Sequence, residues 1–226
     1  GKIIEKGKRI AAHFMEADVE DMDYADGLFT VAGTDRSMSL VDVARSAFMH
    51  AKLPPDLEGG LFETATFSPE ADTFPNGAHV CEVEIDPETG QVNLVSYSVV
   101  DDVGTVINPM GLKGQIHGGI AQGLGQALME QVVYDPDSGQ ILSGSFMDYT
   151  MPRADTTCAI QVESNPVPTK QNPLGAKGAG EAGTVGALPA VMNAVLDALA
   201  PLGVRDLDMP ATSDRVWHAI QQAKTT

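Results

Sequence analysis

The chain has 226 residues, of which 43% are hydrophobic and 20% are charged, the composition of a globular protein large enough to bury a core. Its 31 acidic and 14 basic side chains give a formal net charge of -17. This balance argues against nucleic acid and anionic membranes as partners, because both attract Lys and Arg. It carries no information about catalysis.

Cysteine and histidine positions argue against a metal held by this chain's own side chains. Cys81 and Cys158 lie far apart and form no CxxC pair, although one disulfide between them stays open. The five histidines contain no HxH or HxxxH pair, so we expect no protein-ligated metal or iron–sulfur cluster. Without a visible signal peptide or an apolar run of ~20 residues, we expect a cytoplasmic protein with no membrane span.

Residues 1–60 predict a helix, a hairpin and a second helix. Apolar residues at helical spacing predict the first helix over residues 2–17. Asp26 and Gly27 stand between two short apolar runs, which is a hairpin signal. Residues 39–53 predict the second helix, with the serine at its start as the cap and a proline just beyond its end.

Strand signals follow an irregular stretch rich in Gly, Pro and Thr. Residues 78–86 alternate, with cysteine, valine and isoleucine on one face and two glutamates on the other. The turn DPETG then leads into a return strand over residues 91–104. A second hairpin is expected over 130–151, around DPDSG, and a further strand over 156–164. The two turns look alike because both use turn-forming residues, and we do not interpret them as a repeat.

Three helices complete the expected elements, over residues 114–131, 188–199 and 212–223, the last capped by Thr212 or Ser213. Hairpins and helices are mixed and do not alternate strictly as βαβα. This predicts an α+β fold with a mixed, largely antiparallel sheet and packed helices, and it argues against a doubly wound fold.

A GxGxxG run at residues 178–183 raises the question of a nicotinamide or flavin site. That fingerprint requires a buried strand directly before the glycines, and three prolines between residues 166 and 173 exclude one. The run instead leads into the apolar helix, where small residues let backbone N–H groups approach an anionic ligand. Lys177 could add a positive charge, so a phosphate-bearing cofactor fits this segment.

Glu181 lies inside the glycine run and does not fit phosphate binding, because its carboxylate repels phosphate. Two interpretations stay open from the residues alone. Glu181 is either an ordinary residue at the start of a helix or a base directed at a group that reacts beside the cofactor.

The helix over residues 114–131 contains five glycines, and each interior glycine costs about 0.5–1 kcal/mol relative to alanine. Close packing on a sheet and close approach of a bulky ligand would both explain them. Gln115 and His117 could present hydrogen-bonding groups to that ligand, although His117 could equally be structural or face solvent. Asp101 and Asp102 could be an acid/base pair, but strand-end and turn positions explain them as well.

Two segments, DDVGTVINPMGLKGQIHGGIAQGLGQAL and NPLGAKGAGEAGTVGALPAVMNAV, resemble the molybdenum-binding large subunit of the xanthine dehydrogenase family of molybdenum hydroxylases. That family includes aerobic carbon monoxide dehydrogenases and aldehyde oxidoreductases. The likeness continues through TFPNGAHVCEVEIDPETGQVNLVSYSVVDDVG and extends over essentially the whole chain.

The resemblance implies a molybdopterin cofactor, expected as the cytosine dinucleotide, whose dithiolene holds the molybdenum. It implies that Glu181 is the active-site base while a small substrate, an aldehyde, an N-heterocycle or CO, is oxidised with oxygen from water. The positions that it places at the cofactor are Gln115, Gly118, Gly119, Lys177, Gly178, Ala179 and Gly180. It also implies partners: an iron–sulfur small subunit and a medium subunit that binds FAD.

The family's large subunit is several times longer than this chain. We therefore expect residues 1–226 to be its C-terminal region, a fragment or half of a split subunit, with the N-terminal half as a further partner. Residues 1–60 are expected as a peripheral helix–hairpin–helix segment and 61–226 as the cofactor-binding core. Alone, the chain should be inactive. The alternative is a non-catalytic structural or assembly module.

Overall fold

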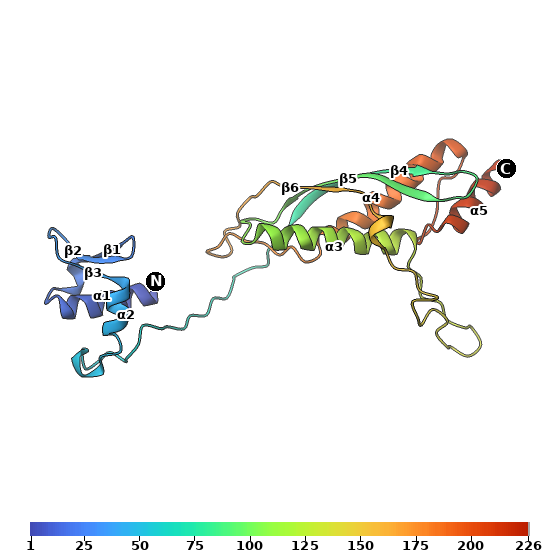
Figure 1. Ribbon diagram of the computed structural model, residues 1–226. Helices are drawn as coiled ribbons and strands as arrows, with labels where there is room; N and C mark the ends of the chain where they lie inside the picture. The colour runs from blue at the N-terminus through green and yellow to red at the C-terminus, as the bar shows by residue number, and fades with distance from the viewer. Residues whose placement is uncertain (226) are drawn as a thin grey trace. The chain divides into compact units, whose positions relative to one another are not determined.

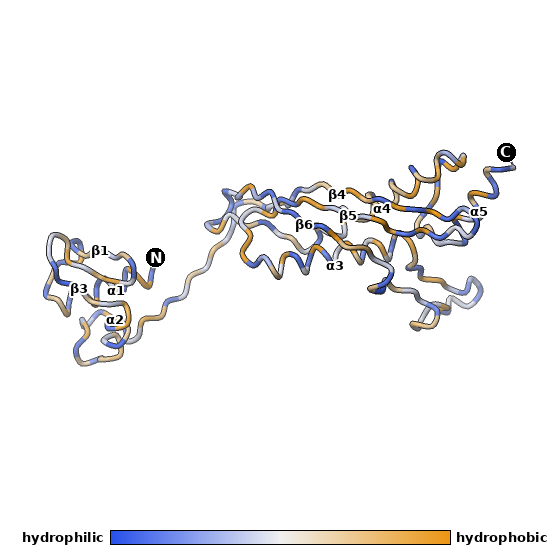
Figure 2. The backbone as a smooth tube through the Cα atoms, turned by 45° about the horizontal axis from the view of Figure 1, so that its top comes forward, coloured by the Kyte–Doolittle hydropathy of each residue, from blue (hydrophilic) through white to orange (hydrophobic). Residues whose placement is uncertain are grey.

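A computed structural model describes residues 1–225. The chain divides into two compact units, Gly1–Ser68 and a second that begins at Pro69. Each unit has its own hydrophobic core. Figure 1 shows the elements of each unit, and Figure 2 shows how apolar residues recur along them.

The first unit packs two helices and a small antiparallel sheet around Ile10, Phe29 and Val43, all fully buried. The predicted hairpin is confirmed: Asp26 (φ 49°) and Gly27 (φ 80°) form its two-residue turn, with the positive φ angles that favour Gly and Asp there. The elements of this unit are α1 (Lys2–Phe14), β1 (Met22–Ala25), β2 (Leu28–Val31), β3 (Ser37–Ser39) and α2 (Leu40–Ser46), with 3-10 turns at Val19–Asp21 and His50–Lys52.

Three details of the first unit differ from the predictions. The first helix ends at Phe14, before the predicted residue 17. Ser39 does cap α2, its hydroxyl accepting the N–H of Asp42 at 3.1 Å, but the helix ends at Ser46 and a separate 3-10 turn follows. Strand β3 was not predicted, because three residues, two of them serine, carry no alternation signal.

The second unit packs helices against a three-stranded sheet of order β4-β5-β6, in which β4 and β5 are antiparallel and β5 and β6 are parallel (Figure 1). This mixed sheet confirms the predicted α+β class. The elements are β4 (Asn76–Ile85), β5 (Val92–Asp102), α3 (Pro109–Leu128), β6 (Ile160–Ser164), α4 (Ala182–Leu199) and α5 (Ser213–Lys224), with 3-10 turns at Ala154–Thr156 and Ala200–Leu202. Thr212 caps α5, its hydroxyl accepting the N–H of Arg215.

The core of the second unit lies between the sheet and helices α3 and α4, which pack on each other while α4 also packs on β4. The predicted alternation of β4 is confirmed. Its inward-facing residues Cys81, Val83 and Ile85 pack against the core, whereas its two glutamates are exposed. The helices predicted over residues 114–131 and 188–199 are also confirmed, although α3 begins earlier, at Pro109, and ends at Leu128, and α4 begins at Ala182. Their fully buried apolar residues are Ile116, Ile120, Leu124, Ala127, Ala187, Val191, Val195 and Leu199.

The second predicted hairpin, over residues 130–151, does not form a ladder. The turn itself is present: Asp135 accepts the N–H groups of Asp137 and Ser138, and Gly139 has φ 70°. Beyond it, only Tyr134 and Ile141 pair, as an isolated bridge. Both flanking segments are largely exposed, and a hairpin without a covering layer is marginal in water.

Helix α4 and the 3-10 turn after it, Ala182–Leu202, are long and apolar enough to cross a membrane by length and composition. The sequence analysis did not expect such a segment. The indication is weak, because the core helix of a soluble protein passes the same test. Here one stripe of α4 is buried against α3 and β4.

Candidate functional site

Backbone hydrogen bonds hold the glycine-rich segment beside the turn that follows β5. The N–H of Thr105 donates to the carbonyl of Gly175 at 2.9 Å, and the N–H of Lys177 donates to the carbonyl of Val103 at 2.8 Å. Irregular chain separates β6 from α4, so no strand leads directly into the glycines. This arrangement confirms that the dinucleotide fingerprint does not apply.

Asp102 ties three segments together at this point. Its Oδ1 accepts the N–H groups of Gly104 at 2.8 Å and Val167 at 2.9 Å, and its Oδ2 accepts from the Lys177 Nζ at 2.5 Å. Both charged side chains are largely buried. The hydrogen bond from Lys177 lowers the pKa of Asp102 to about 2. The Asp102 carboxylate compensates the positive charge of the Lys177 ammonium group. Lys177 therefore does not supply the free positive charge that the sequence suggested.

A pocket of about 290 Å³ lies between the turn after β5, the start of α3 and the glycine-rich segment. It is lined by Gln115 and, up to 65 residues later in the chain, by Lys177, Ala179 and Gly180. In residues 1–225, the N–H groups of Gly178, Ala179 and Gly180 donate to no other group. Unpaired donors beside the positive end of α4 are the arrangement that binds an anion.

The two glycines predicted from the middle of α3 do not line this pocket. Gly119 faces α4, where an added Cβ would lie 2.9 Å from the Cα of Gly183. Gly118 is exposed, and nothing lies within 4 Å of the position its Cβ would take. Close packing therefore explains Gly119 and likewise Gly123, but the partner is a helix and not the sheet that the sequence suggested.

Glu181 lies directly before α4, at the N-cap position, yet its side chain makes no capping hydrogen bond. It is exposed, and within the described chain no hydrogen bond or ion pair engages its carboxylate. It lines a second pocket, of about 330 Å³, together with His79, Asp101 and Val185. The glycine run thus separates two pockets, with free N–H donors in one and a free carboxylate in the other.

His79, Asp101 and Tyr97 form a buried polar cluster, in which His79 and Asp101 line this second pocket. Sequence analysis named Asp101 but missed its two partners. The His79 Nε2 lies 3.6 Å from the Asp101 Oδ1, and its Nδ1 lies 2.7 Å from the Tyr97 hydroxyl. Each of the His79 and Asp101 side chains is 5% exposed. The available signal was a histidine on the inward face of β4, two residues before Cys81.

The remaining candidates have no site geometry. Cys81 and Cys158 are free thiols, and burial raises the pKa of Cys81 to about 12, which leaves it a protonated thiol. His117 is half-buried with its Nε2 unpaired. In the described part of the chain, no group of three or more His, Cys, Asp or Glu side chains could hold a metal ion.

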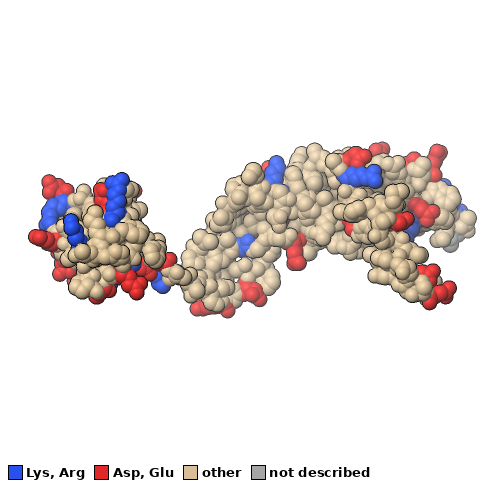
Figure 3. All heavy atoms as spheres, turned by 60° about the horizontal axis from the view of Figure 1, so that its bottom comes forward, with Lys and Arg blue, Asp and Glu red and all other residues tan. Residues whose placement is uncertain are grey.

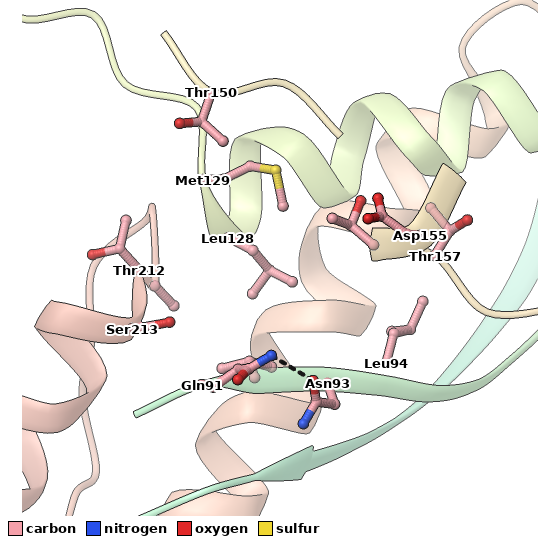
Figure 4. A pocket seen from close by; sticks show the side chains of 13 residues that line it. Gln91, Asn93, Leu94, Leu128, Met129, Thr150, Asp155, Thr157, Thr212 and Ser213 are labelled. Atoms are coloured by element: carbon pink, nitrogen blue, oxygen red, sulfur yellow. Dashed lines mark hydrogen bonds between the residues drawn. The ribbon is translucent and has the colours of Figure 1, made fainter. Parts of the chain in front are cut away.

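A further cavity, of about 460 Å³, lies between the start of β5, the end of α3 and the cap of α5. Figure 4 shows its mainly neutral lining, in which the Gln91 amide donates to Asn93 at 3.1 Å. It contains none of the predicted site residues. Figure 3 shows acidic side chains scattered over the drawn face, without a basic patch that would suit nucleic acid.

Comparison with known proteins places this geometry in context. A family model described as a molybdopterin cofactor-binding domain matches residues 1–158. The carbon monoxide dehydrogenase large chain of Hydrogenophaga pseudoflava is 38% identical over 98% of this chain, and the nicotine 6-hydroxylase large subunit of Paenarthrobacter nicotinovorans is 37% identical over 96%. The match covers 27% of each relative. The crystal structure of quinoline 2-oxidoreductase from Pseudomonas putida 86 superposes with a TM-score of 0.86, at 40% identity, over 97% of this chain and 28% of that one.

Proposed function

The chain belongs to the molybdopterin cofactor-binding domain family, and from this premise we propose that it is the part of a molybdenum hydroxylase that carries the active-site base and one wall of the cofactor site. One observation carries the proposal. Within the run of residues 178–181, Ala179 and Gly180, whose N–H groups are unpaired, line one pocket, and Glu181, whose carboxylate is unpaired, lines its neighbour.

The residues around the first pocket suit the anionic part of a pterin cofactor. The N–H groups of Ala179 and Gly180 can donate to phosphate oxygens, and the partial positive charge at the start of α4 favours the same group. The exposed Gln115 side chain can add an amide donor. When bound, the molybdenum centre supplies the oxidation–reduction chemistry, and we propose the cytosine dinucleotide form from the family resemblance.

Glu181 can act as a proton acceptor, a role that the backbone N–H donors cannot fill. Its carboxylate neither caps α4 nor pairs with a cation in residues 1–225, so its oxygens are available to take a proton from an attacking hydroxyl group. A positioned carboxylate in this role typically contributes about 10²–10⁴ in rate. The neighbouring pocket leaves about 330 Å³ beside it, which is room for a small substrate.

The substrate and partners of the complete protein remain proposals. Relatives at 37–40% identity are named for carbon monoxide and for two N-heterocycles, nicotine and quinoline, so overall likeness does not decide between carbon monoxide and an N-heterocycle. We propose that the remainder of a large subunit, an iron–sulfur subunit and an FAD-binding subunit complete the enzyme. Free thiols at Cys81 and Cys158 fit a reducing compartment such as the cytoplasm.

The test is Glu181→Gln in the complete enzyme, which keeps the shape of the side chain and removes the base. We expect kcat to fall by about 10²–10⁴, while molybdenum and pterin content stay at the parent level. The matched control is Glu82→Gln, an exposed glutamate of β4, which should leave turnover unchanged. Turnover of the Glu181 variant within a few fold of the parent would show that the base is assigned wrongly.

A further inference from the structure

The cluster of His79, Asp101 and Tyr97 lies directly beneath the start of α4. Two glycines make room for it. A Cβ on Gly186 would lie 2.4 Å from the His79 ring, and a Cβ on Gly77 would lie 1.9 Å from the Asp101 Oδ1. At Gly186, five residues after Glu181, the backbone of α4 therefore packs directly against the imidazole ring.

A neighbouring face of the same helical turn packs on α3. A Cβ on Gly183 would lie 2.6 Å from the carbonyl oxygen of Ile116, and the Thr184 hydroxyl donates to the carbonyl of Gly119 at 3.1 Å. The first turns of α4 thus contact α3 on one face and His79 on an adjacent face. Small residues at both contacts let the backbones approach closely, so a displacement of either support displaces the helix start.

The imidazole is hydrogen-bonded at Nδ1, which lies 2.7 Å from the Tyr97 hydroxyl, and its Nε2 lies 3.6 Å from the Asp101 Oδ1. Burial raises the pKa of Tyr97, which keeps its hydroxyl a neutral hydrogen-bonding group. The Asp101 Oδ2 is buried and has no partner in the described residues. The Asp101 carboxyl group therefore depends on the nearby imidazole, because a buried polar group without partners is unfavourable.

We propose that His79, held by Asp101 and Tyr97, is a positioning residue that fixes the first turns of α4 and thereby the place of the Glu181 carboxylate. Its contact with the reaction is indirect, through the backbone of residues 181–186. The expected effect of His79 on turnover rests on the proposed role of Glu181. Its expected effect on the position of α4 does not. Catalytic groups misplaced by about 1 Å commonly cost about 10²-fold in rate.

The test is a double-variant cycle in the complete holoenzyme. His79→Ala removes the support, Gly186→Ala drives a methyl group into the ring, and the double variant places that methyl in the vacated space. Hydrogen exchange of the α4 amides 185–188 reports the helix start directly. We expect each single variant to speed that exchange by about tenfold and to lower kcat by about 10²-fold with a smaller change in KM.

The double variant should recover most of both losses, and molybdenum content should stay near that of the parent throughout. His218→Ala, which changes an exposed histidine of α5, is the control for removing a histidine and should alter neither quantity. Should His79→Ala not yield folded protein, Gly186→Ala and His79→Asn carry the same comparison.

The outcomes separate the two proposals. Unchanged exchange at residues 185–188 in the single variants, or no recovery in the double variant, overturns the positioning role of His79. Faster exchange with unchanged turnover keeps the positioning of α4 but overturns its consequence for Glu181. Glu181→Gln then tests the base role separately: retained turnover contradicts that role, and a loss of about 10²–10⁴ keeps it.

Discussion

Asp101 and Asp102 are neighbours on one strand, and the alternation of a β-strand sends their side chains to opposite faces. Asp101 meets His79 beneath the start of α4, whereas Asp102 meets Lys177 beside the glycine-rich segment. One strand end therefore supports both pockets, each through a different carboxylate. Neither residue acts as an acid/base pair with the other.

The substitution Asp102→Asn should weaken the attachment of the glycine-rich segment to the end of β5. The resulting loss of stability should depend on pH. The folded-state pKa of Asp102 is about 2, below its ordinary 3.8. Its ionised form therefore stabilises the folded chain above pH 3.8, and this contribution is lost as pH falls toward 2. We expect the urea midpoint of the variant to lie below that of the parent at pH 7 and the difference to shrink below about pH 4.

Fluorescence of Trp217, the single tryptophan, can follow this unfolding in the isolated chain. Asp197→Asn, an exposed aspartate of α4, is the control and should show no such pH-dependent difference. A gap between Asp102→Asn and the parent that stays constant from pH 7 to pH 2 would contradict the linkage.

At the residue scale, four of the seven predicted cofactor positions line the first pocket, and Gly118, Gly119 and Gly178 do not. Family resemblance pointed to Gln115 and Lys177, and the structure brings them together. The sequence did not reveal that the Asp102 carboxylate, 75 residues away, compensates the charge of Lys177. It also passed over His79, because a lone histidine has no local pattern. Partners that meet only in the folded chain leave no signal in the spacing of residues.

At the scale of elements, four glycines of α3 divide into two kinds. Gly119 and Gly123 lie against α4, where an added Cβ would meet backbone or side-chain atoms at 2.8 Å and 2.6 Å. Gly114 and Gly118 face open space. The cost of glycine in the helix is thus offset at the first two positions by close packing of α3 on α4, and this packing places α4 beside the site.

Gly119→Ala and Gly114→Ala should change stability in opposite directions. The first crowds the backbone of α4 and should lower the free energy of unfolding by about 1–3 kcal/mol. The second adds helix propensity on an open surface and should raise it by about 0.5–1 kcal/mol. Urea unfolding of both variants measures the two values, and equal stability of both would refute the proposed packing role of Gly119.

The two DP-x-x-G turns show why some elements could be predicted and others could not. Asp86 and Asp135 each accept the N–H of the residue two positions later, Glu88 and Asp137, and Gly90 and Gly139 have φ 73° and 70°. Only the first turn joins a full ladder, because its strands pack on the core of the second unit. Local turn chemistry could be predicted from sequence, but the layer that stabilises a hairpin comes from the rest of the chain.

At the scale of the molecule, the chain spans 27% of the relatives' length, and the volume of its pocket agrees with an incomplete cofactor site. A pocket that buries a drug-sized ligand usually measures about 300–1,000 Å³. The first pocket measures about 290 Å³, which is below this range. Residues outside this chain are therefore expected to cover the remaining cofactor surface.

The isolated 226-residue chain should accordingly hold little cofactor and show no turnover. We expect less than about a tenth of a molybdenum atom per chain, because the exposed cofactor dissociates without its other walls. The complete large subunit from the same host, measured by the same mass spectrometry of metal content, should approach one atom per chain. A shorter chain beginning at Pro69 should match the 226-residue chain, since every residue lining the first pocket lies within 103–180. Near-stoichiometric molybdenum in the isolated chain would instead mean that these residues form a sufficient cofactor site.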